Sequence, residues 1–166
     1  MKKILLLLVA VLALNLSSAQ ERFVIGLSTE LADKNTHNNV YDYGFNLGAR
    51  AELQLDNRFL YISARAFVFP ELNDLTYFDY DLRAGLNYRD RWDENRIYLG
   101  GLIGNIKRDG YKYPKVGIEA GYDHYFNSFY IGFNANYQWK TDNKYWSNDS
   151  GHAVNSVSLE FGWHFN

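Results

Sequence analysis

Residues 41–55 read YDYGFNLGARAELQL, and this stretch decides the fold. Its odd-numbered positions hold Tyr, Tyr, Phe, Leu, Ala, Ala, Leu and Leu, whereas its even-numbered positions hold Asp, Gly, Asn, Gly, Arg, Glu and Gln. Successive side chains of a β-strand point to opposite faces, so this alternation predicts a strand with one apolar face and one polar face.

The same two-residue period recurs along the chain, and clusters of Asn, Asp, Gly and Lys separate its segments. The alternation is weaker in 59–69, where Arg65 shares a face with Tyr61 and Phe67, and in 96–106, where two glycines interrupt it. With 14 Tyr and 11 Phe but only 2 Pro, the composition also favours strands. Eight strands are predicted, at 21–31, 41–55, 59–69, 76–89, 96–106, 115–126, 129–140 and 153–165.

The predicted connections alternate between short and long. Those at 56–58, 90–95 and 127–128 are short, and those at 32–40, 70–75, 107–114 and 141–152 are mostly longer. A transmembrane barrel has short periplasmic turns on one rim, longer loops on the other, and both chain ends on the periplasmic side. The pattern therefore predicts an all-β fold, an eight-stranded antiparallel up-and-down transmembrane β-barrel.

Charge placement decides which face looks outward. A soluble, lipocalin-like barrel would turn the apolar face inward, but an eight-stranded lumen is only just wide enough for side chains and would be overfilled. A charge at the bilayer midplane costs roughly 2–4 kcal/mol, so the charged face belongs inside. The predicted lumen charge network consists of Glu30, Arg50, Glu52, Arg65, Asp81, Arg83, Glu119 and Glu160. These charges suit either an ion path or a polar plug, and the narrow cross-section favours the plug.

Aromatic residues fall at the strand ends, where a membrane barrel carries two interfacial belts. The predicted loop-side belt comprises Tyr41, Tyr43, Phe78, Tyr80, Tyr137 and Trp139. The predicted turn-side belt comprises Phe23, Phe59, Tyr88, Phe129, Trp163 and Phe165.

The first residues have the pattern of a secretory signal peptide. Lys2 and Lys3 precede an apolar run from Ile4 to Leu14, and the small residues Ser17 and Ala19 follow. The run is shorter than the roughly 20 residues that a membrane-spanning helix needs. We expect cleavage after Ala19, which makes residues 1–19 the signal peptide and residues 20–166 the barrel domain.

The remaining composition excludes several classes of function. Residues 20–166 contain 15 Lys and Arg against 19 Asp and Glu, so nothing suggests nucleic-acid binding. The chain has no Cys, which excludes both a disulfide and a lipoprotein anchor. Its four His are scattered singly without the spacing of zinc ligands, so neither a metal nor a cofactor is expected.

The last strand, with Leu159, Phe161, Trp163 and Phe165 on its apolar face, ends in an aromatic residue followed by Asn166. In this, and in its strand pattern, the chain resembles the small outer-membrane β-barrel superfamily of OmpA- and OmpX-type barrels. The resemblance implies that these four residues form the assembly signal read by the barrel-assembly machinery. It also implies a monomer in the bacterial outer membrane, in contact with membrane lipid and lipopolysaccharide.

Some barrels of this size are lipid A deacylases with a His and a Ser two residues apart on a strand. That spacing is absent here, and the nearest grouping is Asp149, His152 and Ser156, in and beside a polar segment rich in turn residues. We therefore expect a non-enzymatic barrel with a structural or surface-interaction role. A lipid A-modifying enzyme, a narrow pore and a soluble ligand carrier remain the alternatives.

Overall fold

The computed structural model describes residues 22–35, 41–42, 47–55, 59–69, 77–108, 111–140 and 153–165. The predicted signal peptide and the predicted loop 141–152 lie outside the described residues. The strands are β1 (Arg22–Asn35), β2 (Tyr41–Asp42), β3 (Leu47–Gln54), β4 (Leu60–Phe69), β5 (Tyr77–Arg89), β6 (Asn95–Arg108), β7 (Tyr111–Phe126), β8 (Phe129–Lys140) and β9 (Ala153–Phe165). Within the described residues, no helix is long and apolar enough to cross a membrane.

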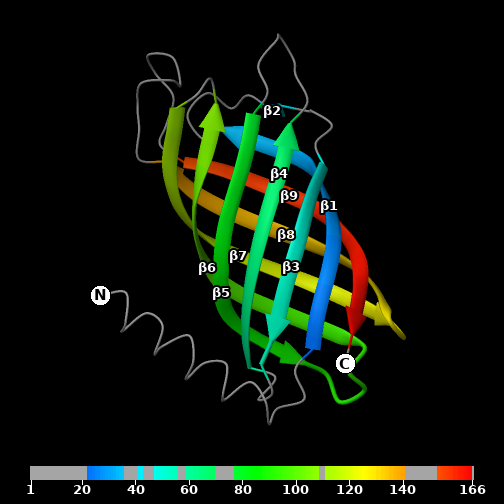
Figure 1. The fold of residues 1–166 in the computed structure, drawn as a ribbon. Coiled ribbons are helices and arrows are strands. Elements are labelled where there is room, and N and C mark those ends of the chain that lie inside the picture. The colour runs from blue at the N-terminus through cyan, green and yellow to red at the C-terminus, as the bar shows by residue number, and fades with distance from the viewer. Residues whose placement is uncertain are drawn as a thin grey trace, which may run out of the picture.

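The strands form one antiparallel sheet that closes on itself (Figure 1). Each strand from β3 to β9 pairs with the next, and β9 returns to β1 from Phe23 opposite Phe165 onward. Both β2 and β3 pair with the other edge of β1, where Gly48 lies opposite Ser28 and Asp42 opposite Asp33. β2 and β3 therefore follow one another along the same edge of β1 and together form one strand of the wall. This confirms the predicted eight-stranded antiparallel barrel.

The strand limits differ from the prediction mainly at the loop-side rim, which is the rim away from the C-terminus in Figure 1. The predicted long connection at 107–114 is wrong, because β6 and β7 stay paired up to Arg108 opposite Tyr111. Pro114 lies within β7, opposite Asn105 of β6 and one residue before Lys115, where the described ladder to β8 begins. The first strand also runs to Asn35, past a register shift between Glu30 and Ala32 that marks a β-bulge.

The opposite rim, called here the turn-side rim, holds the start of β1, the end of β9 and the two short connections that the structure describes in full (Figure 1). Asn127 and Ser128 link β7 to β8, and Asn127 has a φ of 52°. Asp93, in the connection between β5 and β6, has a φ of 62°. Asn and Asp enter this left-handed region more readily than other non-glycine residues, so both turns suit their sequences.

Away from the bulge in β1, the described side chains alternate between the two faces of the wall. Outward apolar residues remain exposed, as with Leu82 at 61% and Ile103 at 63%, whereas the inward Arg96 and Lys115 are 0% exposed. The charged faces of the strands therefore meet around the axis of the barrel, and the apolar faces form its outer surface.

Candidate functional site

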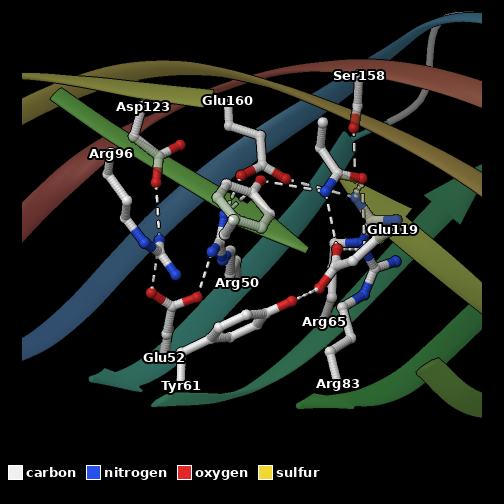
Figure 2. A network of polar contacts seen from close by, with 12 residues as sticks. Arg50, Glu52, Tyr61, Arg65, Arg83, Arg96, Glu119, Asp123, Ser158 and Glu160 are labelled. Carbon is white, nitrogen blue, oxygen red and sulfur yellow. Dashed lines mark hydrogen bonds and ion pairs between the residues drawn. The ribbon is translucent and has the colours of Figure 1, made fainter. Parts of the chain in front are cut away.

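Seven of the eight predicted lumen residues come from five different strands and lie together inside the barrel, and Figure 2 labels all of these except Asp81. Arg50 and Glu52 lie on β3, Arg65 on β4, Asp81 and Arg83 on β5, Glu119 on β7 and Glu160 on β9. None of these seven side chains is more than 4% exposed. Glu30 lies in β1, but its side chain is outside the described set.

Arg50 is the centre of the first cluster. Its guanidinium donates to the carboxylates of both Glu52 and Glu160. Glu160 also forms an ion pair with Arg65, whose Nη1 lies 3.4 Å from Oε1. Arg65 Nη1 further donates to Ser158 Oγ at 3.3 Å, so the cluster joins β3, β4 and β9 across the lumen.

Arg83 is the centre of the second cluster. It donates to Glu119, and its Nη2 donates to Asp81 Oδ2 at 3.0 Å. Lys115 approaches the same Asp81 oxygen at 2.8 Å and forms a further ion pair with Asp79. Asn134 connects the two clusters, because its Oδ1 lies 3.3 Å from both Arg65 Nη1 and Arg83 Nη1.

The third part of the network was not predicted from the sequence. Arg96 Nη1 lies 2.7 Å from Glu52 Oε1 and 2.8 Å from Asp123 Oδ2, so Glu52 is shared by two arginines. Sequence reasoning missed Arg96 because Gly100 and Gly101 blur the alternation of β6. Extending the two-residue period back from Leu99 and Ile97 would have placed Arg96 on the inward face. The prediction also omitted Asp79, Arg89, Lys115 and Asp123, which the structure buries.

The buried charges balance. Among the described residues, the buried cations are Arg50, Arg65, Arg83, Arg89, Arg96 and Lys115. The buried anions are Glu52, Asp79, Asp81, Glu119, Asp123 and Glu160. Six cations against six anions leave this set without a net charge that would select an ion of either sign.

Buried tyrosines fill the space between the charged clusters, a feature that the predicted network did not include. Tyr61, Tyr98, Tyr125 and Tyr130 are at most 4% exposed. The guanidinium carbon of Arg96 lies 4.5 Å from the ring centre of Tyr98 and 5.0 Å from that of Tyr61. Cation–π contacts of this kind add to the ion pairs and hold the arginines in place.

Glycines on the inward face make room for these rings. Gly100 lies next to the Tyr61 ring, and a Cβ added to Gly100 would meet the Tyr61 hydroxyl oxygen at 2.1 Å. Lying across this gap, Tyr61 donates its hydroxyl hydrogen to Glu119 Oε1 at 2.6 Å. Gly121 likewise leaves room for Tyr98, because a Cβ added to Gly121 would lie 2.2 Å from Cζ of the Tyr98 ring.

Gly100→Ala is therefore expected to lower the free energy of unfolding by about 1–3 kcal/mol, since the new methyl group overpacks the lumen and displaces Tyr61 from Glu119. Gly101→Ala is the matched control, because its Cβ would point outward with only Gly117 O within 4 Å, at 3.8 Å. We expect the control to be neutral or more stable by roughly 0.5 kcal/mol. Urea unfolding of both variants in lipid vesicles tests this, and equal stabilities would contradict the packing argument.

A separate set of contacts crosses the turn-side mouth of the lumen. Arg22 Nη2 on β1 lies 2.5 Å from Asp93 Oδ2 in the connection between β5 and β6, and Arg89 Nη1 lies 2.9 Å from Oδ1. Partial burial opposes ionisation of Asp93, but the hydrogen bond and charge of Arg89, and then Arg22, outweigh it and lower the pKa of that carboxyl. The 90–94 connection is thereby tied to the first strand, beside a cavity of about 540 Å³ that Trp92 and His164 help to line.

The predicted belt residues that the structure describes lie on the outer face. Phe59 and Tyr88 are more than 60% exposed at the turn-side rim, and Trp139 is 41% exposed at the loop-side rim. Phe23, Trp163 and Phe165 are exposed, and Phe78, Tyr80, Phe129 and Tyr137 are half-buried. Tyr43 and the side chain of Tyr41 are outside the described set. Trp92, which is 73% exposed, and Phe126 were missed because they lie in or next to a connection.

The possible catalytic grouping is only partly described. Asp149 and His152 lie outside the described residues, and Ser156 is buried on the inward face of β9. Over the part of the chain that the structure describes, no group of three or more His, Cys, Asp or Glu side chains is placed to hold a metal ion.

Comparison with known proteins identifies a fold. No protein-family model matches the chain, and no curated protein matches it. Among solved structures, Neisserial surface protein A (NspA) matches with a TM-score of 0.61 at 11% identity, over 87% of this chain and 97% of that chain. Ail, the attachment invasion locus protein of Yersinia pestis, matches with a TM-score of 0.51 at 16% identity, over the same shares of the two chains. At these identities the likeness shows a shared fold alone.

Proposed function

We propose that this protein is a non-enzymatic, integral β-barrel of the bacterial outer membrane, with a polar plug in its lumen and a structural or interactive role at the cell surface. The observation that carries the proposal is the inverted distribution of side chains. Leu82, Leu86 and Ile103 are each at least 61% exposed on the outer wall, while six cations and six anions of the described residues are buried inside. Contiguous apolar surface of this extent is rare on soluble proteins and suits acyl chains.

Residues 1–19 and the last strand supply the route to that membrane. The signal peptide would export the chain, and the outward-facing Leu159, Phe161, Trp163 and Phe165 would be recognised by the barrel-assembly machinery. With the chain ends on the turn-side rim, that rim faces the periplasm and the loop-side rim faces the exterior.

The plug is supported by how completely the lumen charges are paired. Arg50, Arg83 and Arg96 each contact two carboxylates, and each lies on a different strand. An ion path would need water between such groups, whereas these side chains contact one another directly across the axis.

Fractionation of cells that express the protein tests the membrane assignment. We expect the barrel in the outer-membrane fraction, with faster migration in unheated than in heated gel samples, because a membrane barrel stays folded in detergent. Proteolysis of intact cells should cut within 141–152, since that connection would lie outside the cell. Recovery of the barrel from the soluble periplasm would contradict the proposal.

Bilayer recording tests the plug. The protein reconstituted in a planar bilayer is expected to show no stepwise conductance at neutral pH, because paired side chains occupy the cross-section. Arg96→Ala is the informative variant, since it removes the side chain that joins Glu52 to Asp123. Regular conductance steps from the unaltered protein would favour the narrow pore instead.

The absence of catalysis is tested separately. Alanine replacement of His152 and Ser156 is expected to leave the lipid A of the expressing strain unchanged by mass spectrometry. A difference in lipid A acylation between the strain that expresses this variant and the strain that expresses the unaltered protein would favour the lipid A-modifying enzyme.

A further inference from the structure

Two lysines face each other on the outer wall near the loop-side rim. Lys107 on β6 and Lys112 on β7 are directly opposed in the ladder, and both side chains are exposed. Like charges in directly opposed positions destabilise a sheet. An anion held between the two ammonium groups would remove that repulsion.

Their height on the wall places them at the edge of the apolar band. The outward positions of β6 are apolar from Ile97 to Ile103, and Asn105 and Lys107 follow. The strand rises about 33 Å from Ile97 to Lys107, or about 25 Å across the membrane at a tilt of about 40°. That is close to the height of the apolar band of such barrels, so the lysine pair lies at headgroup level.

A groove of about 690 Å³ lies on the wall below this pair. Ala49, Ala51, Ala64 and Ala66 are opposed in two cross-strand pairs and contribute to its lining, together with Ile25 from β1 and Leu82 from β5. The groove continues to Tyr80 and Asn105, and Lys107 follows two residues after Asn105 on the same face of β6. An apolar chain lying in the groove would therefore reach the level of the lysines at its polar end.

We propose that the Lys107–Lys112 pair and this groove together bind one molecule of lipid A, with a phosphate between the ammonium groups and an acyl chain in the groove. This inference rests on the proposed function, because only an outer-membrane barrel places its loop-side rim in the leaflet that contains lipid A. Acyl chains fill any depression in a membrane protein, so the groove alone gives no preference for one lipid. Preference comes from the lysine pair, which suits the strongly anionic headgroup of lipid A.

The test is a binding titration of the full-length, outer-membrane-expressed protein in detergent micelles, with bisphosphorylated lipid A as the probe. Lysines near a membrane surface each change anionic-lipid binding by about 5-fold, so Lys107→Gln with Lys112→Gln is expected to weaken lipid A binding roughly 30-fold. Arg91→Gln, at an exposed position of the turn-side rim, is the charge control and should leave binding unchanged.

The groove is tested in the same titration. Ala64→Leu is expected to weaken binding, because the added side chain occupies the groove. Ala120→Leu, on the outer face of β7 away from the groove, is expected to have no effect. Heat-modifiable migration establishes that each variant is folded, and the two single lysine variants replace the double variant if it does not fold.

Several outcomes would overturn the inference. The first is unchanged lipid A binding in the lysine variants, and the second is equally tight binding of dephosphorylated lipid A by the unaltered protein. The third is that the lysine variants lose affinity for phosphatidylglycerol as much as for lipid A, which would indicate a general anionic-lipid surface. A dimer that Ala64→Leu dissociates, without any change in lipid binding, would assign the groove to a second copy. A barrel that fractionates with the outer membrane but shows no lysine-dependent binding would contradict this inference alone, whereas a soluble periplasmic protein would contradict the proposed function.

Discussion

Glu52→Gln is expected to lower the free energy of unfolding by about 3 kcal/mol, at the lower end of the roughly 3–5 kcal/mol that follows loss of one partner from a buried ion pair. Glu52 is 1% exposed and is shared by Arg50 and Arg96. Glutamine keeps the size of the side chain but removes its charge, so the lumen acquires an excess cation far from water. Each arginine retains one other carboxylate, Glu160 or Asp123, which limits the loss.

Urea unfolding in lipid vesicles, followed by tryptophan fluorescence, measures this effect. Glu94→Gln is the matched control, because Glu94 is exposed in the turn-side connection and its replacement should change stability by no more than about 0.5 kcal/mol. Adding Glu160→Gln to Glu52→Gln should cost more than the sum of the two single changes, since Arg50 then loses both carboxylates. Equal stabilities of the Glu52 and Glu94 variants would show that the network does not hold the barrel together.

Leu82→Arg is expected to destabilise the barrel in a bilayer by about 2–4 kcal/mol. Leu82 is 61% exposed near the middle of the outward positions of β5, which run from Phe78 to Tyr88. An arginine there would lie at the level of the acyl chains, where its charge has no water and no described carboxylate facing it. On a protein surrounded by water, the same exposed change would be nearly neutral.

Tyr88→Arg, on the same strand and with 64% exposure, supplies the control for depth. Because Tyr88 lies near the turn-side interface, an arginine there is expected to cost only about 0–1 kcal/mol. Unfolding of both variants in vesicles of one lipid composition gives the difference. A Leu82 variant as stable as the Tyr88 variant would mean that β5 does not cross a membrane.

Strand number and closure were predictable because they depend on a local property. In Tyr41–Leu55, and from Val157 to Phe165 in the last strand, every second residue is apolar, and a shift of one residue would exchange the two faces of the strand. The same reasoning failed at Arg96 and at residues 107–114. Arg96 was missed because Gly100 and Gly101 carry no side chain that would mark a face of the strand. Residues 107–114 were predicted as a connection because the part of the β6–β7 hairpin beyond the apolar band has no need of an apolar face.

The sequence by itself determined that the chain forms strands with opposite apolar and charged faces, because side-chain direction alternates along any extended backbone. It could not determine which carboxylate each arginine contacts. Arg50 reaches Glu160 across 110 positions of the chain, and Tyr61 reaches Glu119 across 58, through register and closure that only the folded barrel fixes. The pairing inside the lumen and the meeting of Lys107 with Lys112 on its wall therefore belong to the tertiary structure, since contacts between strands depend on how the sheet is sheared and closed.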